Sequence, residues 1–354
     1  MESRRGMGIA AVTGAAAYLG WRTVRRFMQA DLAGRVVLIT GGSRGLGLAL
    51  AREMGAHGCK LAICARDDYE LWRARKDLQA RGFEVKTEVC DVSDREAVAR
   101  MVSSVSEHYG AIDILINNAG IIQVGPMEAM ALPDYEQAMA VNFWGAVYTT
   151  MAVLPQMRAR GGGKIVNITS IGGKVAVPHL LPYDCAKFAF LGFSEGLHAE
   201  LAKDGIVVTT VVPGLMRTGS PVNAIFKGKR ADEFTWFGLG DATSVTSMSA
   251  DRAARRIVTA VRRGEGEITL SWQAKMLRLA HDLFPSLMTD VLGVVNRMLP
   301  RADEIDPGHS TGLEIEQASW RLTTIIEKAA KAYNQHNGPS VSPAYLNRRE
   351  PTGD

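Results

Sequence analysis

Short apolar runs alternate with helix-length segments from Arg35 to about Leu270, and this alternation limits the fold more than any other feature of the sequence. Parallel strands that are buried on both faces form continuous apolar runs, and the segments between them supply the helices that cover the sheet. The pattern therefore predicts an α/β fold with a doubly wound parallel sheet. The expected strands are 36–40, 61–65, 84–89, 112–117, 163–169, 206–212 and 267–270.

Capping and terminating residues mark several ends of the connecting helices. Asp94 and Ser249 are expected to be N-caps, and Gly82, Gly110 and Gly205 are expected to end helices. The expected helices are 46–57, 68–81, 94–109, 134–160, 183–203 and 250–263.

The alternation stops after Leu270, which divides the 354 residues into four expected parts. Residues 272–299 are rich in Leu, Met and Val, and residues 314–334 have amphipathic helical spacing. These segments are short for an independent domain, so we expect a helical extension. The parts are an N-terminal apolar and basic segment (1–33), the α/β domain (34–270), the helical extension (271–337) and a flexible polar tail (338–354).

Composition excludes several classes of protein. The chain is 47% hydrophobic and 22% charged, which is ordinary for a globular protein. Its net charge of +4 is small, and it has no basic stretch interleaved with aromatic residues, so we expect no nucleic-acid partner. The four cysteines lack zinc or disulfide-scaffold spacing, which indicates thiols in a reducing compartment. No histidine has a ligand-like partner, and we expect no metal.

A glycine-rich turn follows the first expected strand and opens the first helix. Glycines at such a turn let the backbone approach a pyrophosphate, whose negative charge the helix N-terminus stabilises. The sequence therefore predicts a dinucleotide site. The residues concerned are Thr40, Gly41, Ser43, Arg44, Gly45, Leu46 and Gly47.

The end of the second strand indicates which nucleotide binds. An acidic residue there would bind the ribose 2′-OH and select NAD, but Ala65 is followed by Arg66. Together with Arg44, Arg66 could hold a 2′-phosphate through charge-assisted hydrogen bonds, which predicts NADP(H). The alternative is that both arginines are ordinary surface residues, or that Asp67 reaches the ribose and the cofactor is NAD.

Tyr183 and Lys187 are one helical turn apart, so their side chains project from the same face. A nearby ammonium stabilises a phenolate and lowers the pKa of the tyrosine from about 10 toward neutrality, where it can exchange a proton. Ser170 ends an expected strand at the carboxyl edge of the sheet, where its hydroxyl could bind a substrate carbonyl. These three residues predict acid–base chemistry on a carbonyl or alcohol.

The sequence resembles the classical short-chain dehydrogenase/reductase family over about residues 34–270. The matching motifs are TGGSRGLG at 40–47, NNAG at 117–120, Asn142, Ser170, Tyr183-x-x-x-Lys187 and Pro213-Gly214, in the order and spacing of that family. The resemblance implies one Rossmann-like domain with about seven strands. It says nothing of the segments before and after this region.

The resemblance also implies roles for individual residues. Tyr183 would be the catalytic acid/base, Lys187 its partner, Ser170 the residue that positions the carbonyl, and Asn142 the anchor of a water-linked proton relay. Further cofactor contacts are implied for Asp91, Val92, Asn118, Ala119, Gly120, Pro213, Gly214 and Thr218.

The site residues predict an NADP(H)-dependent oxidoreductase with a small-molecule carbonyl or alcohol substrate. The expected substrate-facing residues are mostly apolar, which favours a lipophilic substrate such as a steroid, a lipid or an acyl intermediate. The alternatives are an NAD-linked alcohol dehydrogenase and a non-catalytic nucleotide-binding or redox-sensing protein, although a pure binder would not need Ser170, Tyr183 and Lys187. The expected substrate-facing residues are Ile171, Val175, His179, Leu180, Leu215, Met216, Phe226, Trp236 and Phe237.

Two apolar stretches are not expected in the sequence of a soluble enzyme. Met7–Trp21 carries no charge and has arginines on both sides, and residues 272–299 add a second concentration of apolar side chains. They could seat a cytoplasmic protein on the surface of a membrane, or bury one another between the subunits of a homo-oligomer. A cleaved signal peptide is a third interpretation of the first stretch.

Overall fold

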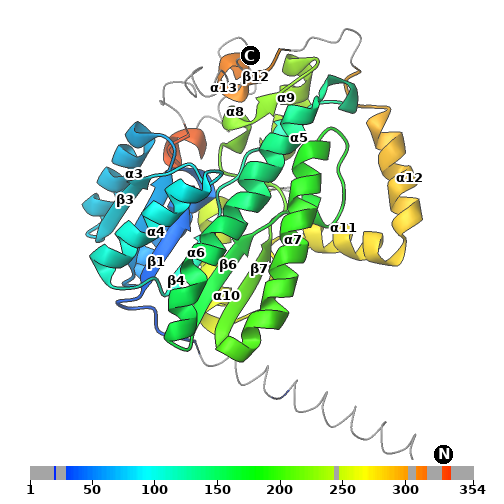
Figure 1. Ribbon diagram of the computed structural model, residues 1–354. Helices are drawn as coiled ribbons and strands as arrows, with labels where there is room; N and C mark the ends of the chain where they lie inside the picture. The colour runs from blue at the N-terminus through cyan, green and yellow to red at the C-terminus, as the bar shows by residue number, and fades with distance from the viewer. Residues whose placement is uncertain (1–19, 21–28, 243–246, 302–307, 317–328, 336–354) are drawn as a thin grey trace, which may run out of the picture.

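A computed structural model describes residue 20 and residues 29–242, 247–301, 308–316 and 329–335 (Figure 1). Most of the expected N-terminal segment and all of the expected tail lie outside these ranges.

A single parallel sheet of seven strands forms the centre of the α/β domain, in the order β11-β7-β6-β4-β1-β2-β3 (Figure 1). The predicted fold class is confirmed. The strands are β1 (Val36–Thr40), β2 (Lys60–Ala65), β3 (Val85–Val89), β4 (Ile114–Asn117), β6 (Gly163–Ile168), β7 (Ile206–Val212) and β11 (Glu267–Thr269).

Helices cover both faces of this sheet, which explains why its strands are continuous apolar runs. Successive residues of β1 point to opposite faces: Val37 and Ile39 join one hydrophobic core, and Val36 and Leu38 join the other. The first core is covered by α2 (Gly45–Ala56), α3 (Asp68–Ala80) and α10 (Ala250–Arg263). The second is covered by α4 (Arg95–Tyr109), α6 (Gly145–Ala159) and α7 (Leu181–Leu201), which lie in front of the sheet in Figure 1.

Two expected helix features differ from the structure. The helix expected at 134–160 is divided into α5 (Leu132–Met139), a π-helical turn (Ala140–Trp144) and α6. Asn142 lies in that turn and bonds the backbone of Ile121, 21 positions earlier in the chain, a contact that helical periodicity does not encode. The capping residue Asp94 accepts two backbone N–H groups as expected, whereas Ser249 precedes α10 without a capping bond from its side chain.

Short elements, of which all but β5 follow β7 in the chain, build a second layer over the carboxyl edge of the sheet. Two small sheets pair β8 with β10 and place β9 between β5 and β12. The elements are β5 (Gln123–Val124), β8 (Met216–Arg217), α8 (Ser220–Asn223), β9 (Ile225–Phe226), α9 (Arg230–Ala242), β10 (Met248–Ser249), β12 (Ser310–Thr311) and α13 (Gly312–Glu316).

The described parts of the helical extension lie in two different places. α11 (Trp272–Leu283) and α12 (Pro285–Asn296) form an L-shaped arm at the edge of the molecule, with α12 separated from α7 in Figure 1. By contrast, β12 pairs with β9, and residues 329–335 return to the glycine-rich turn. Among the described residues, no helix combines the length and apolarity that a membrane span requires.

Candidate active site

The glycine-rich turn between β1 and α2 has the geometry of a phosphate site. Gly41 and Gly45 have positive φ angles of 63° and 56°, and a side chain at Gly47 would collide with the carbonyl of Gly41. The first helical hydrogen bond of α2 runs from the N–H of Leu48 to the carbonyl of Arg44 (3.2 Å). The backbone N–H groups of Leu46 and Gly47 precede it in the first turn, where a helix has no carbonyl partners for its amides. A pyrophosphate therefore fits this turn.

Thr40 joins the turn to the neighbouring strand end. Its hydroxyl accepts the backbone N–H groups of Asn118 (3.0 Å) and Ala119 (3.1 Å), and the Asn118 amide donates to the carbonyls of Thr40 and Gly41. Asn118 and Ala119 thus reach the predicted place beside the turn, at the carboxyl ends of β1 and β4.

Of the residues predicted to choose the nucleotide, Arg44 has an unexpected partner. Its Nη1 bonds Glu70 Oε1 at 2.8 Å and Asn223 Oδ1 at 2.7 Å, and Ser43 donates to Glu70 Oε2 at 3.1 Å. Arg66 is exposed at the end of β2. Asp67, the alternative ribose ligand, accepts the N–H of Glu70 at 2.8 Å and caps α3. A carboxylate therefore pairs with Arg44, one of the two arginines expected to bind the 2′-phosphate.

Asp91 and Val92 follow β3, where the adenine contact is implied. The Asp91 carboxylate accepts the backbone N–H (2.9 Å) and hydroxyl (2.8 Å) of Ser93, and Val92 is buried. The Asp91 carboxylate is thereby fixed in an Asx turn next to the expected adenine site.

The four predicted catalytic residues converge at the carboxyl edge of the sheet. A side chain added at Gly120 would lie 2.6 Å from Asn142 Oδ1 and 3.6 Å from Lys187 Nζ. One added at Gly172 would lie 3.4 Å from both Ser170 Oγ and Tyr183 Cε1. Two glycines thus let polar groups from β6, α7 and the π-helical turn crowd into one site.

Burial controls the protonation of this site. It raises the pKa of Tyr183 to about 12, an effect that a hydrogen bond with Ser170 opposes and the neighbouring Asp184 reinforces. Burial lowers the pKa of Lys187 to about 8. Lys187 Nζ lies 5.6 Å from the centre of the Tyr183 ring and donates to the carbonyl of Ile168 at 3.1 Å. The pKa of Tyr183 is therefore raised and not lowered as expected, because desolvation outweighs the hydrogen bond with Ser170.

Asp184 is a buried carboxyl group next to the catalytic tyrosine. Its Oδ2 accepts the N–H of Val177 at 2.6 Å, whereas its Oδ1 is buried without a hydrogen-bond partner among the described residues. Burial raises its pKa to about 8, so at neutral pH the carboxyl group is largely protonated.

A ladder of buried polar side chains, which was not predicted, links the strands and helices beneath the site. The Asn117 amide donates to Asn167 Oδ1 at 2.9 Å, and the Asn167 amide donates to Ser194 Oγ at 2.9 Å. Ser194 bonds Thr210 at 2.7 Å, and Thr149 donates to Asn117 at 2.6 Å. Asn167 and Thr210 were visible as polar residues inside apolar runs, which is the signal that could have identified them.

Apolar side chains of the second layer lie over Tyr183, including several of those predicted to face the substrate. Leu180, Phe226 and Phe237 belong to one hydrophobic cluster, against which Tyr183 and Trp236 pack. Val175 is fully buried. Thr218 is also buried, on the loop between β7 and α8 that is expected to contact nicotinamide. Pro213 accepts the N–H of Ile171 at 2.8 Å and joins that loop to the catalytic edge.

One polar group within this apolar cluster was not predicted. Glu233 of α9 is fully buried and bonds His179 Nδ1 at 2.8 Å, and the indole of Trp236 donates to its other oxygen at 2.6 Å. His179 has a φ of 66°, which is unusual for a residue other than glycine. Glu233 thereby connects α9 to the turn that precedes α7.

A family model described as "short chain dehydrogenase" matches residues 35–225. The "Dehydrogenase/reductase SDR family protein 7-like" of Anopheles gambiae is 41% identical over 245 residues, 68% of this chain and 76% of that protein. The "Putative oxidoreductase SadH" of Mycobacterium tuberculosis is 36% identical over 244 residues, 68% of this chain and 88% of its own length.

Solved structures agree with this fold. A short-chain dehydrogenase from Streptomyces avermitilis is similar with a TM-score of 0.65 and 29% identity, covering 74% of this chain and 97% of its own. A gluconate 5-dehydrogenase from Burkholderia cenocepacia, solved with NADP and tartrate, has a TM-score of 0.60 and 28% identity, covering 69% and 96%. With these matches and the arrangement of the site, the chain belongs to the short-chain dehydrogenase/reductase family and is an oxidoreductase of that family.

Proposed function

We propose that this protein is an NADP(H)-dependent enzyme that interconverts a carbonyl and an alcohol, with Tyr183 as acid/base. The observation that carries the proposal is the convergence of Ser170, Tyr183, Lys187 and Asn142 around Gly120 and Gly172. A protein that only binds or senses a nucleotide would need the glycine-rich turn but not this group. Because a buried lysine such as Lys187 costs stability, its presence favours chemistry over binding alone.

Each residue of this group has a distinct task. The nicotinamide ring, when bound, supplies or accepts the hydride. Ser170 donates a hydrogen bond to the carbonyl oxygen, on which negative charge builds during reduction. Tyr183 gives that oxygen its proton, and Lys187 stabilises the resulting phenolate with its ammonium. Asn142, held by the backbone of Ile121, orders the path by which the proton is replaced.

Arg66 and Arg44 support NADP(H) as the cofactor. Asp67, the alternative ribose ligand, is engaged as the N-cap of α3. A solved structure of actinorhodin polyketide ketoreductase with NADPH is similar at 28% identity with a TM-score of 0.59. The ion pair between Glu70 and Arg44 favours the alternative, an NAD-linked dehydrogenase, because that carboxylate competes with a 2′-phosphate.

The substitution Arg66→Ala tests the choice of cofactor. Loss of one charged hydrogen bond should weaken NADPH binding by about 1.5–3 kcal/mol and leave NADH binding almost unchanged. Fluorescence titration of both cofactors measures this difference. Equal losses for the two would mean that Arg66 supports the fold and does not bind the phosphate.

A lipophilic substrate is proposed because apolar side chains lie over Tyr183. A curated relative named gluconate 5-dehydrogenase, from Gluconobacter oxydans, is 35% identical over 188 residues and has a polar substrate in its name, so the proposal needs a direct test. NADPH consumption should be followed with steroidal, long-chain and acyl ketones and with sugar-derived ketones. Turnover of the polar ketones alone would contradict it.

We also propose that the arm of α11 and α12 is a contact surface. It would contact either the cytoplasmic face of a membrane or a second subunit of a homo-oligomer. α12 buries none of its residues, and Leu287 and Val294 are 58% and 57% exposed. Exposed apolar surface of this kind marks an interaction site in proteins. Flotation with anionic vesicles and light scattering distinguish the two contacts.

A further inference from the structure

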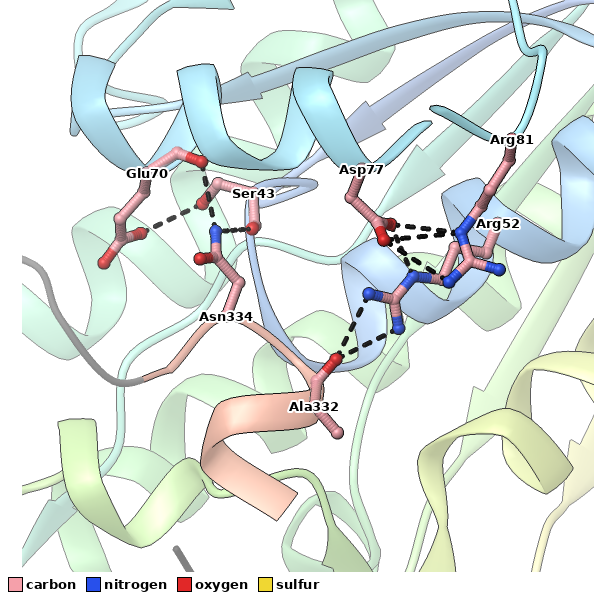
Figure 2. Close-up of polar contacts among 7 residues, drawn as sticks. All are labelled: Ser43, Arg52, Glu70, Asp77, Arg81, Ala332 and Asn334. Atoms are coloured by element: carbon pink, nitrogen blue, oxygen red, sulfur yellow. Dashed lines mark hydrogen bonds and ion pairs between the residues drawn. The ribbon is translucent and has the colours of Figure 1, made fainter. Parts of the chain in front are cut away.

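Residues 329–335, here called the C-terminal segment, lie against the glycine-rich turn although they are far from it in the sequence (Figure 2). The N–H of Gly45 donates to the carbonyl of Tyr333 at 2.9 Å. Two guanidinium nitrogens of Arg52 each donate to the carbonyl of Ala332 at 3.1 Å. Arg52 in turn bonds Asp77 at 2.8 Å, which braces the segment against α2 and α3.

Asn334 makes the central contact of this segment. Figure 2 shows its amide nitrogen between two backbone carbonyls, those of Ser43 (2.8 Å) and Glu70 (3.1 Å). Asn334 has a φ of 59°, in the left-handed region that asparagine tolerates better than most residues. The backbone of the segment thus adopts an uncommon conformation at the residue that joins the turn to α3.

The chemistry of these contacts complements a bound anion. The partial negative charge of a carbonyl oxygen repels a phosphate. The Asn334 amide donates hydrogen bonds to the carbonyls of Ser43 and Glu70 beside the turn, which offsets that charge. The amides of Leu46 and Gly47, which could bind a phosphate, are not among the groups that Asn334 contacts. Of the first-turn donors, the segment takes the N–H of Gly45 through Tyr333.

The same segment also contacts the loop that carries Thr218 and Gly219. Ala330 is fully buried, and a side chain added at Gly219 would lie 2.7 Å from its Cα. The Asn223 amide donates to the side chain of Gln335, while its oxygen accepts from Arg44. The segment therefore connects the glycine-rich turn with the loop that is expected to contact nicotinamide.

We propose that Asn334 is a positioning residue of the cofactor site, and that the C-terminal segment holds the glycine-rich turn and the Gly219 loop around the dinucleotide. The proposal rests on the dinucleotide function proposed above for the turn. It assigns a binding role to a segment outside the α/β domain, and it predicts that the segment closes over the cofactor and is not displaced by it.

The substitution Asn334→Gly tests this role, because glycine keeps the left-handed backbone and removes only the amide. We expect the dissociation constants of both NADPH and NADH to rise about tenfold, since the turn serves the pyrophosphate that they share. The kcat at saturating cofactor should stay near the wild-type value while the KM for the cofactor rises. Asn334→Asp, which cannot donate to either carbonyl, should have an effect at least as large.

The matched control is Asn296→Gly at the exposed end of α12, which should change neither constant. Thermal unfolding without cofactor shows whether the variants are folded. As a measurement on the wild-type protein, saturating NADPH should slow cleavage by a lysine-specific protease after Lys331, which is exposed in the segment.

Each outcome decides between defined alternatives. Unchanged dissociation constants in Asn334→Gly would overturn the proposal and leave the segment a purely structural role. Tighter cofactor binding, or faster cleavage after Lys331 with NADPH, would overturn it in favour of a segment that blocks the site. If the wild-type protein binds neither cofactor, the proposed function itself fails. If the wild-type protein and the variant bind the cofactors equally well, only the role of Asn334 fails.

Discussion

α7 and α12 are both rich in apolar residues, yet they occupy very different environments. α7 buries residues along its length, including Lys187, Phe190, Leu191 and Ser194, and it carries the catalytic tyrosine. α12 buries none of its residues and packs on α11. Apolar residues in a helix show that one of its faces is expected to be covered. They do not show whether the covering surface belongs to the same chain or to another molecule.

This difference also predicts how the two regions respond to substitution. Side chains of α7 are held by the sheet and by the buried polar ladder, so changes there should alter catalysis or stability. Among the described residues, the side chains of α12 contact little besides α11, so changes there should alter mainly what the protein associates with.

The largest effect is expected for Tyr183→Phe in α7, which removes the phenol and keeps the ring. Turnover should fall by about 10²–10⁴-fold, the range of general acid–base catalysis, because the variant lacks the hydroxyl proposed to give the substrate oxygen its proton. NADPH should bind within a few-fold of wild type, since the phosphates contact the glycine-rich turn. Steady-state kinetics and fluorescence titration measure both quantities. A variant that keeps more than a tenth of the activity would show that another residue is the acid.

The next largest effect is expected for Asn167→Ala in the ladder below α7. The substitution removes one of the two acceptors of the Asn117 amide, leaving only Thr150, and removes a donor from Ser194. The free energy of unfolding should fall by about 2–4 kcal/mol. Urea denaturation measures it, with Asn296→Ala on α12 as the matched control, for which a change within about 0.5 kcal/mol is expected. Similar losses in both variants would remove the distinction between the regions.

A pH-dependent effect is expected for Asp184→Asn. The folded protein raises the pKa of Asp184 to about 8 from its ordinary 3.8, so the carboxyl group holds its proton more tightly when folded. Its contribution to stability is fully present below pH 3.8 and is lost as the pH rises through 8. The variant should therefore gain stability over wild type between pH 5 and pH 9, by at most a few kcal/mol. Melting curves across this range test it, and a constant difference at all pH values would argue against the buried acid.

The smallest effect on stability is expected on α12, where Leu287, Val291 and Val294 can be changed together to serine. Since these side chains are exposed, the free energy of unfolding should change by less than about 1 kcal/mol. Vesicle binding or oligomer formation should instead be lost, whichever of them the wild-type protein shows. A destabilisation as large as that of Asn167→Ala would place α12 in the core of an assembly.

Local sequence patterns predicted much of the fold and of the candidate site of this protein. Each expected strand of the central sheet is present, with its ends within about two residues of the expected positions. The apolar runs and the glycines that end helices are local features, so the sequence shows them directly. The glycine-rich turn and the spacing of Tyr183 and Lys187 were also visible, since each lies within a single turn or helix. The break at Asn142 was not, and the contact of Asn142 with Ile121 is one that helical periodicity does not encode.

Only the tertiary structure decided which distant groups meet. Glu70 binds Arg44, Glu233 binds His179 and Asn334 binds Ser43, each across a separation that periodicity cannot bridge. Their side chains are polar, so in the sequence they resemble ordinary solvated residues. A buried polar group is stable only when its partner is placed within hydrogen-bond distance, and the packing of the helices on the sheet determines that placement.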